Sequence, residues 1–187
     1  MSGPPPRSFV GVDDGPFDPD WRGDVPLVGV VYVGPRLDGV VTGAARRDGR
    51  NATERIARLI EDSRFDPKIV LLGGIAVAGF NVVDIHALST RLGAPVLVVA
   101  RKRPNLARIR EVLHEVVPGG ARKWRLIERA GPMEPLEGVW VQRAGMSPGE
   151  AARALRATTL HGRLPEPLRV AHLLAGALVR GHSRGGA

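Results

Sequence analysis

Residues 68–103 constrain the fold most, because they contain two short apolar runs separated by a helical pattern. The runs at residues 69–72 and 96–100 are rich in Val, Ile and Leu, which is typical of strands covered on both faces. Between them, apolar residues recur at helical spacing from Asn81, the expected N-cap, to Gly93, the expected helix end. A strand–helix–strand unit implies parallel strands joined by a right-handed crossover, so the chain is predicted to be an α/β protein.

Ligands of such sheets bind beyond the carboxyl ends of the strands. Gly73 and Gly74 follow the first apolar run, and glycines there let the backbone turn sharply or approach a ligand closely. Arg101 and Lys102 follow the second run and are candidates for binding a phosphate, although a solvated charge run is the simpler interpretation. We therefore expect this edge of the sheet to contain the functional site.

Further patterns complete the predicted sheet. Residues 8–12 are predicted to form a strand that ends at Asp13 and Asp14, and residues 27–33 and 40–45 are predicted to form a hairpin. This order, three strands in a meander and then helix, strand, helix and strand, matches the ribonuclease H-like fold, with a mixed five-stranded sheet flanked by helices. The other expected elements are helices at residues 51–60, 104–116, 147–158 and 166–179, and weaker strands at residues 124–127 and 139–142.

Composition limits the class of protein. The chain of 187 residues is expected to form one domain, with residues 1–7 as a disordered lead and residues 181–187 as a frayed tail. It has no cysteine and no apolar run of the ~20 residues that span a bilayer, so we expect a cytoplasmic protein that does not enter membranes. A net charge of +8 favours a polyanionic partner, although arginine excess that reflects genome base composition is an alternative.

Four sequence blocks carry a family resemblance. They are GVDDGPF at residues 11–17, RRDGRNATERI at 46–56, LLGGIAVAGFNVVDIHAL at 71–88 and RLPEPLRVAHLLA at 163–175. With these blocks the sequence resembles the endonuclease dU family, which is related to endonuclease V. The resemblance implies a single endonuclease V-like domain, a divalent metal such as Mg²⁺, with Mn²⁺ or Co²⁺ as alternatives, and cleavage of DNA that contains a deaminated base. The proposed lesion is deoxyuridine.

The resemblance also implies site residues. The first-strand carboxylate of endonuclease V corresponds to Asp13, and its second carboxylate matches Asp48. Its third carboxylate falls at Gly73, which has no side chain, whereas the endonuclease dU pattern has an aspartate later, at Asp84. The implied metal ligands are Asp13, Asp14, Asp48 and Asp84, and the implied catalytic set is Asp13, Asp48, Asp84, His172 and Lys102.

The chemistry suits these residue types, because metal-assisted hydrolysis of a phosphodiester needs carboxylates at the ends of adjacent elements. Each residue also has a structural alternative. Asp14 and Asp48 both precede a glycine and could shape a turn, and Asp84 could sit in the first turn of a helix. His172 lies among apolar residues, where a histidine is often part of the core.

A damage-specific nuclease must also contact a base that has left the stack. The candidates for this contact are Gly73, Gly74, Gly79, Phe80 and Asn81, and a core position is the alternative for Phe80. The arginines that could follow the nucleic-acid backbone are Arg153, Arg156, Arg163 and Arg169, although Arg169 could pair internally with an acid.

Three functions are therefore open. The first is a metal-dependent endonuclease acting on DNA with a deaminated base. The second is a catalytically impaired nucleic-acid-binding relative of endonuclease V, because a carboxylate is missing at Gly73. The third is a small-molecule α/β enzyme that uses the glycine-rich turn.

Overall fold

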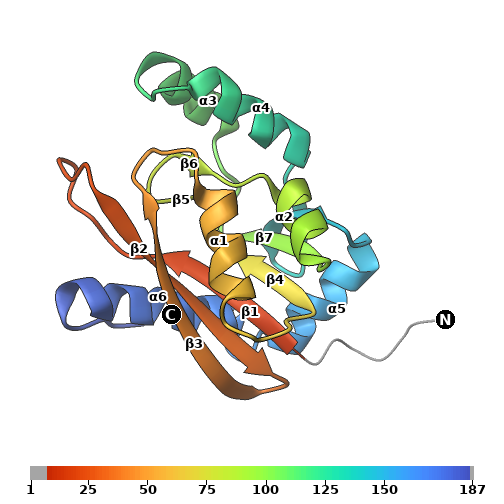
Figure 1. The fold of residues 1–187 in the computed structure, drawn as a ribbon. Coiled ribbons are helices and arrows are strands. Elements are labelled where there is room, and N and C mark those ends of the chain that lie inside the picture. The colour runs from red at the N-terminus through yellow and green to blue at the C-terminus, as the bar shows by residue number, and fades with distance from the viewer. Residues whose placement is uncertain (1–7, 186–187) are drawn as a thin grey trace.

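The computed structural model describes residues 8–185, and its centre is one mixed sheet of seven strands (Figure 1). The strands are β1 (Ser8–Asp14), β2 (Asp24–Val33), β3 (Arg36–Arg46), β4 (Ile69–Leu72), β7 (Val96–Ala100), β8 (Glu134–Leu136) and β9 (Val139–Ala144). Their order across the sheet is β3-β2-β1-β4-β7-β9-β8. β1, β4 and β7 are parallel, whereas β2 and β3 form an antiparallel hairpin beside β1.

This arrangement confirms the predicted ribonuclease H-like order of the first five of these strands along the chain. The sheet is larger than the expected five strands, because β8 and β9 add an antiparallel hairpin beside β7. The strand expected at residues 139–142 is confirmed as part of β9. The expected disordered lead at residues 1–7, and residues 186–187 of the expected frayed tail, lie outside the described residues.

Helices cover both faces of the sheet. Their bounds are α1 (Ala52–Glu61), α2 (Ile85–Leu92), α3 (Leu106–Glu115), α4 (Gly120–Ala130), α5 (Pro148–Thr158) and α6 (Glu166–Arg180). A small separate hairpin is made of β5 (Ala76–Val77) and β6 (Asn81–Val82).

Alternate residues of β1 point to opposite faces, as a strand requires. Val10 and Val12 pack in the core under α1 and α2, whereas Phe9 packs in the core under α5. The helical pair of α3 and α4 lies beside the small hairpin at one end of the sheet (Figure 1).

The local signals for α5 are confirmed. Ser147 accepts a hydrogen bond from the Glu150 amide, and the Glu150 side chain accepts one from the Ser147 amide, which is a complete capping box. Pro148 occupies the first helical position, where its missing N–H costs no hydrogen bond.

Two predictions are wrong. Asn81 is not a helix cap: it lies in β6, and α2 begins at Ile85 with Asp84 as its N-cap. Residues 124–127 are not a strand but part of α4, because Trp124 and Ile127 lie one helical turn apart and pack in one cluster with α3.

None of the helices within residues 8–185 combines the length and the apolar character that crossing a bilayer requires.

Candidate active site

Two carboxylates stand where β1 ends, beside the end of β4. Val12 and Leu72 are register partners in the parallel pair, so Asp13 lies next to Gly73. A side-chain Cβ placed on Gly73 would lie 3.3 Å from Asp13 Oδ1. The structure therefore brings Asp13 and the glycine turn together, as the ribonuclease H-like order predicts.

His172 reaches Asp13 from α6. Gly11 lets this helix pack directly on β1, since a Cβ on Gly11 would lie only 2.4 Å from the carbonyl carbon of Pro167. Little more than one helical turn later, His172 Nδ1 lies 2.8 Å from Asp13 Oδ2. The imidazole is 64% exposed and lines a cleft of about 1070 Å³ together with Asp13 and Asp14. His172 is therefore a surface residue of this cleft and not a core histidine.

The two neighbouring carboxylates are electrostatically strained. Burial raises the pKa of Asp13, although hydrogen bonds from the Asp14 amide and from His172 oppose that rise. Burial and then the charge of Asp13 raise the pKa of Asp14 to about 6. A cation between them would relieve both the desolvation and the mutual repulsion.

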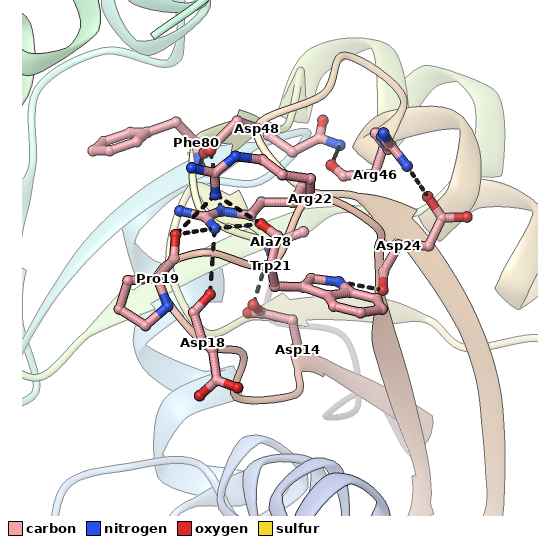
Figure 2. A network of polar contacts seen from close by, with 12 residues as sticks. Asp14, Asp18, Pro19, Trp21, Arg22, Asp24, Arg46, Asp48, Ala78 and Phe80 are labelled. Carbon is pink, nitrogen blue, oxygen red and sulfur yellow. Dashed lines mark hydrogen bonds and ion pairs between the residues drawn. The ribbon is translucent and has the colours of Figure 1, made fainter. Parts of the chain in front are cut away.

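Asp48 belongs to the same neighbourhood through a shared turn. The Ala78 amide donates to Asp14 Oδ2 at 2.9 Å, and the Ala78 carbonyl accepts from the Asp48 amide at 2.9 Å. Asp48 Oδ1 also accepts from the Phe80 amide at 2.8 Å, and Figure 2 shows these contacts to the turn at residues 78–80. Ala78 and Asp48 both have left-handed backbones, with φ of 49° and 50°. Such strain at non-glycine residues is common at functional sites.

Arg47 ties this turn to the loop that follows β1. Its Nε lies 3.2 Å from Asp48 Oδ2, and its guanidinium lies 5.1 Å from the centre of the Phe17 ring. Its Nη1 donates to the carbonyls of Pro19 and Trp21. Neither Arg47 nor Phe17 was predicted as a site residue. The available signal was that Arg47 directly precedes Asp48 in RRDGRNATERI and that Phe17 lies three positions after Asp14 in GVDDGPF.

Lys123 is a second residue that the sequence did not reveal. Its side chain is only 2% exposed, and its ammonium donates to the main-chain carbonyl of Asp48 from α4. Desolvation lowers the pKa of this lysine. No motif marks Lys123, because the contact depends on how α4 packs against the loop after β3.

Asp84 is placed elsewhere. Its Oδ1 accepts from the Ala87 amide at 3.0 Å as the cap of α2, and its Oδ2 pairs with Arg129 of α4. It lines a separate cleft between α1, α2 and α4. The structure therefore does not bring Asp84 together with Asp13 and Asp14, and its carboxylate has a cationic partner of its own.

Some of the residues predicted to contact a base lie beside the carboxylates, and others do not. Asn81 is fully buried, and its amide is engaged by the Ala52 amide, the Arg46 carbonyl and Asn51 Oδ1. Phe80 is half-buried in the apolar cluster formed with α3 and α4, which agrees with the alternative that it is a core residue. Gly79 lies against Asp48, where a Cβ would come within 2.5 Å of Oδ1. Gly73 remains beside Asp13, and Gly74 follows it in the turn after β4.

The candidate phosphate contacts lie in a second cleft, of about 670 Å³. Arg101, Lys102 and Arg163 are exposed there, and the half-buried Arg169 also lines this cleft. Arg169 also pairs with Glu166 at 2.6 Å, so its internal pairing is confirmed. Arg101 lies close enough to Asp13 to lower the pKa of that carboxyl group, which connects this cleft electrostatically with the carboxylates.

These residues fit one mode of metal binding. Within residues 8–185, no group of three or more His, Asp or Glu side chains is close enough to hold a metal ion on its own. Mg²⁺, however, commonly uses one or two carboxylates and completes its shell with water and substrate phosphate. Asp13 and Asp14 supply such a pair in an open cleft, so the donor set fits a partly hydrated Mg²⁺ and not a closed protein cage.

Known proteins with similar sequences settle the family. The family model described as Endonuclease dU matches residues 7–179. The chain belongs to the endonuclease dU family. A member from Deinococcus radiodurans, named UPF0215 protein, is 56% identical over 191 residues, which cover 99% of this chain and 98% of that protein. A UPF0215 protein from Methanothermobacter thermautotrophicus is 44% identical and covers 96% of this chain and 91% of its own length.

Solved structures confirm the fold of this endonuclease dU protein. A protein of unknown function from Archaeoglobus fulgidus has a TM-score of 0.86 at 30% identity, covering 93% of this chain and 99% of its own. Human endonuclease V has a TM-score of 0.61 at 18% identity and covers 94% and 85%. Endonuclease V from Ciona intestinalis, solved with a 24mer DNA containing an inosine followed by a ribo-adenosine, has a TM-score of 0.56 at 13% identity and covers 89% and 83%.

Proposed function

We propose that this endonuclease dU protein is a divalent-metal-dependent endonuclease that cleaves DNA at a deaminated base, with deoxyuridine as the first candidate lesion. Its family supports a nuclease, and the fold is that of endonuclease V. The observation that carries the proposal is the contact of 2.8 Å between His172 and Asp13 in an open cleft, directly beside the Asp14 carboxylate. A carboxylate pair that can hold a metal ion and an oriented imidazole that can carry a proton are groups suited to metal-assisted hydrolysis of a phosphodiester.

Asp13 and Asp14 would hold Mg²⁺, or Mn²⁺ or Co²⁺ in its place. Such an ion would supply Lewis acidity and lower the pKa of water bound to it. His172 donates from Nδ1 to Asp13 in the tautomer that this contact favours, which leaves Nε2 able to accept a proton from water in the cleft. Arg101 and Lys102 would bind the phosphate group, the arginine as a planar fork and the lysine as a point charge.

DNA is the proposed partner. The net charge of +8 favours binding to a polyanion through counterion release. Gly73 presents no side chain beside Asp13, so a nucleic-acid strand would be able to approach the carboxylates closely. A flipped base is the expected form of the substrate, since stacking in the duplex otherwise covers the base that the protein must recognise.

The test is a panel of DNA duplexes that each carry one uracil, one hypoxanthine or no lesion. Each duplex is incubated with Mg²⁺, Mn²⁺, Co²⁺ or EDTA, and strand cleavage is measured. We expect cleavage only at a lesion and only with metal, and we expect Asp13→Ala to abolish it. Asp18→Ala is the matched control, because Asp18 is an exposed carboxylate of the loop after β1 and uses only its carbonyl in contacts. Absence of cleavage from every duplex with every metal would refute the proposal.

A second function is favoured by one observation. Gly73 stands beside Asp13, at the position where the resemblance to endonuclease V implies a third carboxylate, so the proposed site has one acidic ligand fewer. The protein would then bind nucleic acid without cutting it. Salt-sensitive DNA binding that is indifferent to metal, combined with intact duplexes in the panel, would select this function.

A further inference from the structure

A small basic cleft lies behind the loop that carries Asp48. It has a volume of about 300 Å³ and opens between α1, α2 and α4. The basic side chains that line it are Arg50, Arg91, Arg122 and Lys123. It shares no lining residue with the cleft that contains Asp13 and His172, so it is a separate site.

The acidic side chains at this cleft already have cationic partners. Asp84 pairs with Arg129, and Glu54 pairs with Arg58 at 2.8 Å. Arg91 in turn pairs with Glu61 outside the cleft at 2.7 Å. In the part of the chain that the structure describes, no carboxylate lies within ion-pair distance of the remaining three cations, which are Arg50, Arg122 and Lys123.

Lys123 gives the strongest indication of a missing ligand. Its side chain is 2% exposed, yet an ammonium group has three N–H donors. Among residues 8–185, its only acceptor is the carbonyl of Asp48. A buried charge with one neutral acceptor is costly. The Asp48 carboxylate acts on Lys123 only from beyond ion-pair distance, so an anion in the cleft would supply the missing acceptors and a nearer counter-charge.

The N-terminus of α1 faces the same cleft through Thr53 and Glu54. The Asn51 side chain does not cap this helix, because it accepts from the Arg46 amide and from Asn81, and the first helical amide, that of Ala52, donates instead to Asn81 Oδ1. The remaining first-turn amides, those of Thr53 and Glu54, and the positive end of the helix dipole add to the attraction for an anion.

We propose that this cleft is a phosphate-binding site in which Lys123, Arg50 and Arg122 together bind one phosphate group. The phosphate belongs either to a free phosphate compound or to the backbone of a nucleic-acid strand, and both present the same oxygens to these donors. Since Lys123 also holds the carbonyl of Asp48, an occupant of the cleft contacts the loop that carries this carboxylate. The proposal does not depend on nuclease activity.

Thermal unfolding in inorganic phosphate tests the site directly. Phosphate is compared with chloride at equal ionic strength, and a ligand that binds only the folded state raises the melting temperature. We expect such a rise for the wild type, and we expect Arg50→Ala and Arg122→Ala each to weaken the apparent phosphate affinity by about tenfold, the usual loss for a charged hydrogen bond. Arg125→Ala is the matched control, because Arg125 is exposed on the same helix but does not line the cleft. It is expected to respond to phosphate like the wild type.

DNA binding identifies the source of the phosphate. Affinity is measured against salt concentration with Asp13→Ala protein in EDTA, so that no strand is cut. If the ligand is a backbone phosphate, each arginine variant lowers the slope of log affinity against log salt by about one, whereas a free phosphate leaves the slope unchanged. Loss of the phosphate response or of the slope in Arg50→Ala and Arg122→Ala supports the site. Behaviour equal to that of Arg125→Ala in both measurements overturns it.

Discussion

His172 Nδ1 and Asp13 Oδ2 lie 2.8 Å apart although 159 positions separate the two residues in the chain. Gly11 makes this contact possible, because its missing side chain lets α6 pack against β1. The Asp13 carboxylate thereby orients an imidazole that is otherwise exposed. An imidazole held in this way presents one defined nitrogen to the cleft, as a proton carrier must.

The first prediction concerns His172→Ala. If the imidazole carries a proton, the variant loses about 10²- to 10⁴-fold in the single-turnover cleavage rate while DNA affinity stays unchanged. The reason for the loss is that Asp13 and Asp14 would still hold the proposed metal, whereas no nitrogen would accept the proton. His86→Ala is the control, because His86 is exposed on α2 and contacts only the Arg129 carbonyl. The cleavage rate measured against pH separates a proton-carrying role of His172 from a purely structural one. If the role is purely structural, conservative variants of His172 cleave more slowly, but the shape of their pH profile stays that of the wild type.

The second prediction concerns the pH dependence of stability in Asp14→Asn. The pKa of Asp14 is about 6 in the folded protein and 3.8 as its ordinary value, so the folded state binds the proton more tightly. The stability that this proton provides is fully present below pH 3.8 and is lost as the pH rises through 6. Asparagine cannot ionise, so the variant should become more stable than the wild type between pH 4 and pH 7, by about 2 kcal/mol after allowance for solvent screening.

Urea unfolding at pH 4 and pH 7 measures this difference. Asp18→Asn serves as the control and is expected to follow the wild type at both pH values. Adding Mg²⁺ at pH 7 should stabilise the wild type more than Asp14→Asn, because the variant has lost one of the two proposed ligands. An equal gain in both proteins would argue against Asp14 as a metal ligand.

The sequence was sufficient to predict the elements whose signals are local. The apolar runs of β4 and β7, the hairpin of β2 and β3, and the capping box of α5 all follow from residues close together in the chain. These elements fix the order of the central strands, and that order places Asp13 beside Gly73. The position of the candidate site was therefore predictable from local patterns and topology together.

The parts that were missed depend on contacts between distant segments. Asp84 was predicted to lie beside Asp13, but it caps α2 and pairs with Arg129, 45 positions later. In the sequence, Lys123 is one of several basic residues of α4. Its contact with the Asp48 carbonyl forms only because α4 packs against the Asp48 loop. Trp124 and Ile127 were read as a strand because a short apolar run does not distinguish a strand from a buried helix.

The third prediction concerns Gly79→Ala. Gly79 has φ of 79°, and a Cβ there would lie 2.5 Å from Asp48 Oδ1. The variant should therefore carry a backbone cost of about 1–2 kcal/mol and also displace the Asp48 carboxylate from the Phe80 amide. Gly34→Ala is the matched control, because Gly34 has φ of 58° but open space around its Cβ position. We expect both variants to lose stability and only Gly79→Ala to lose cleavage, whereas equal cleavage by the two would show that the position of Asp48 is unimportant.

The last prediction introduces the carboxylate that the resemblance to endonuclease V implies at the end of β4. Aspartate at Gly73 would place its Cβ 3.3 Å from Asp13 Oδ1, so the neighbouring carboxylate needs to move only slightly. Without metal, Gly73→Asp should be less stable than the wild type, because a third negative charge joins Asp13 and Asp14. With Mg²⁺ it should be stabilised at lower metal concentrations, because the site gains an oxygen ligand.

Gly74→Asp provides the contrast, since Gly74 has φ of 120° and an aspartate there is strained whether or not metal is present. Melting temperatures across a Mg²⁺ titration separate a gained ligand from simple damage. Cleavage by the same proteins then decides between the two proposed functions. If the wild type is an active enzyme, Gly73→Asp should only shift the Mg²⁺ requirement. If the wild type binds DNA without cutting it and Gly73→Asp cleaves, the glycine at the end of β4 is what separates this protein from an active nuclease.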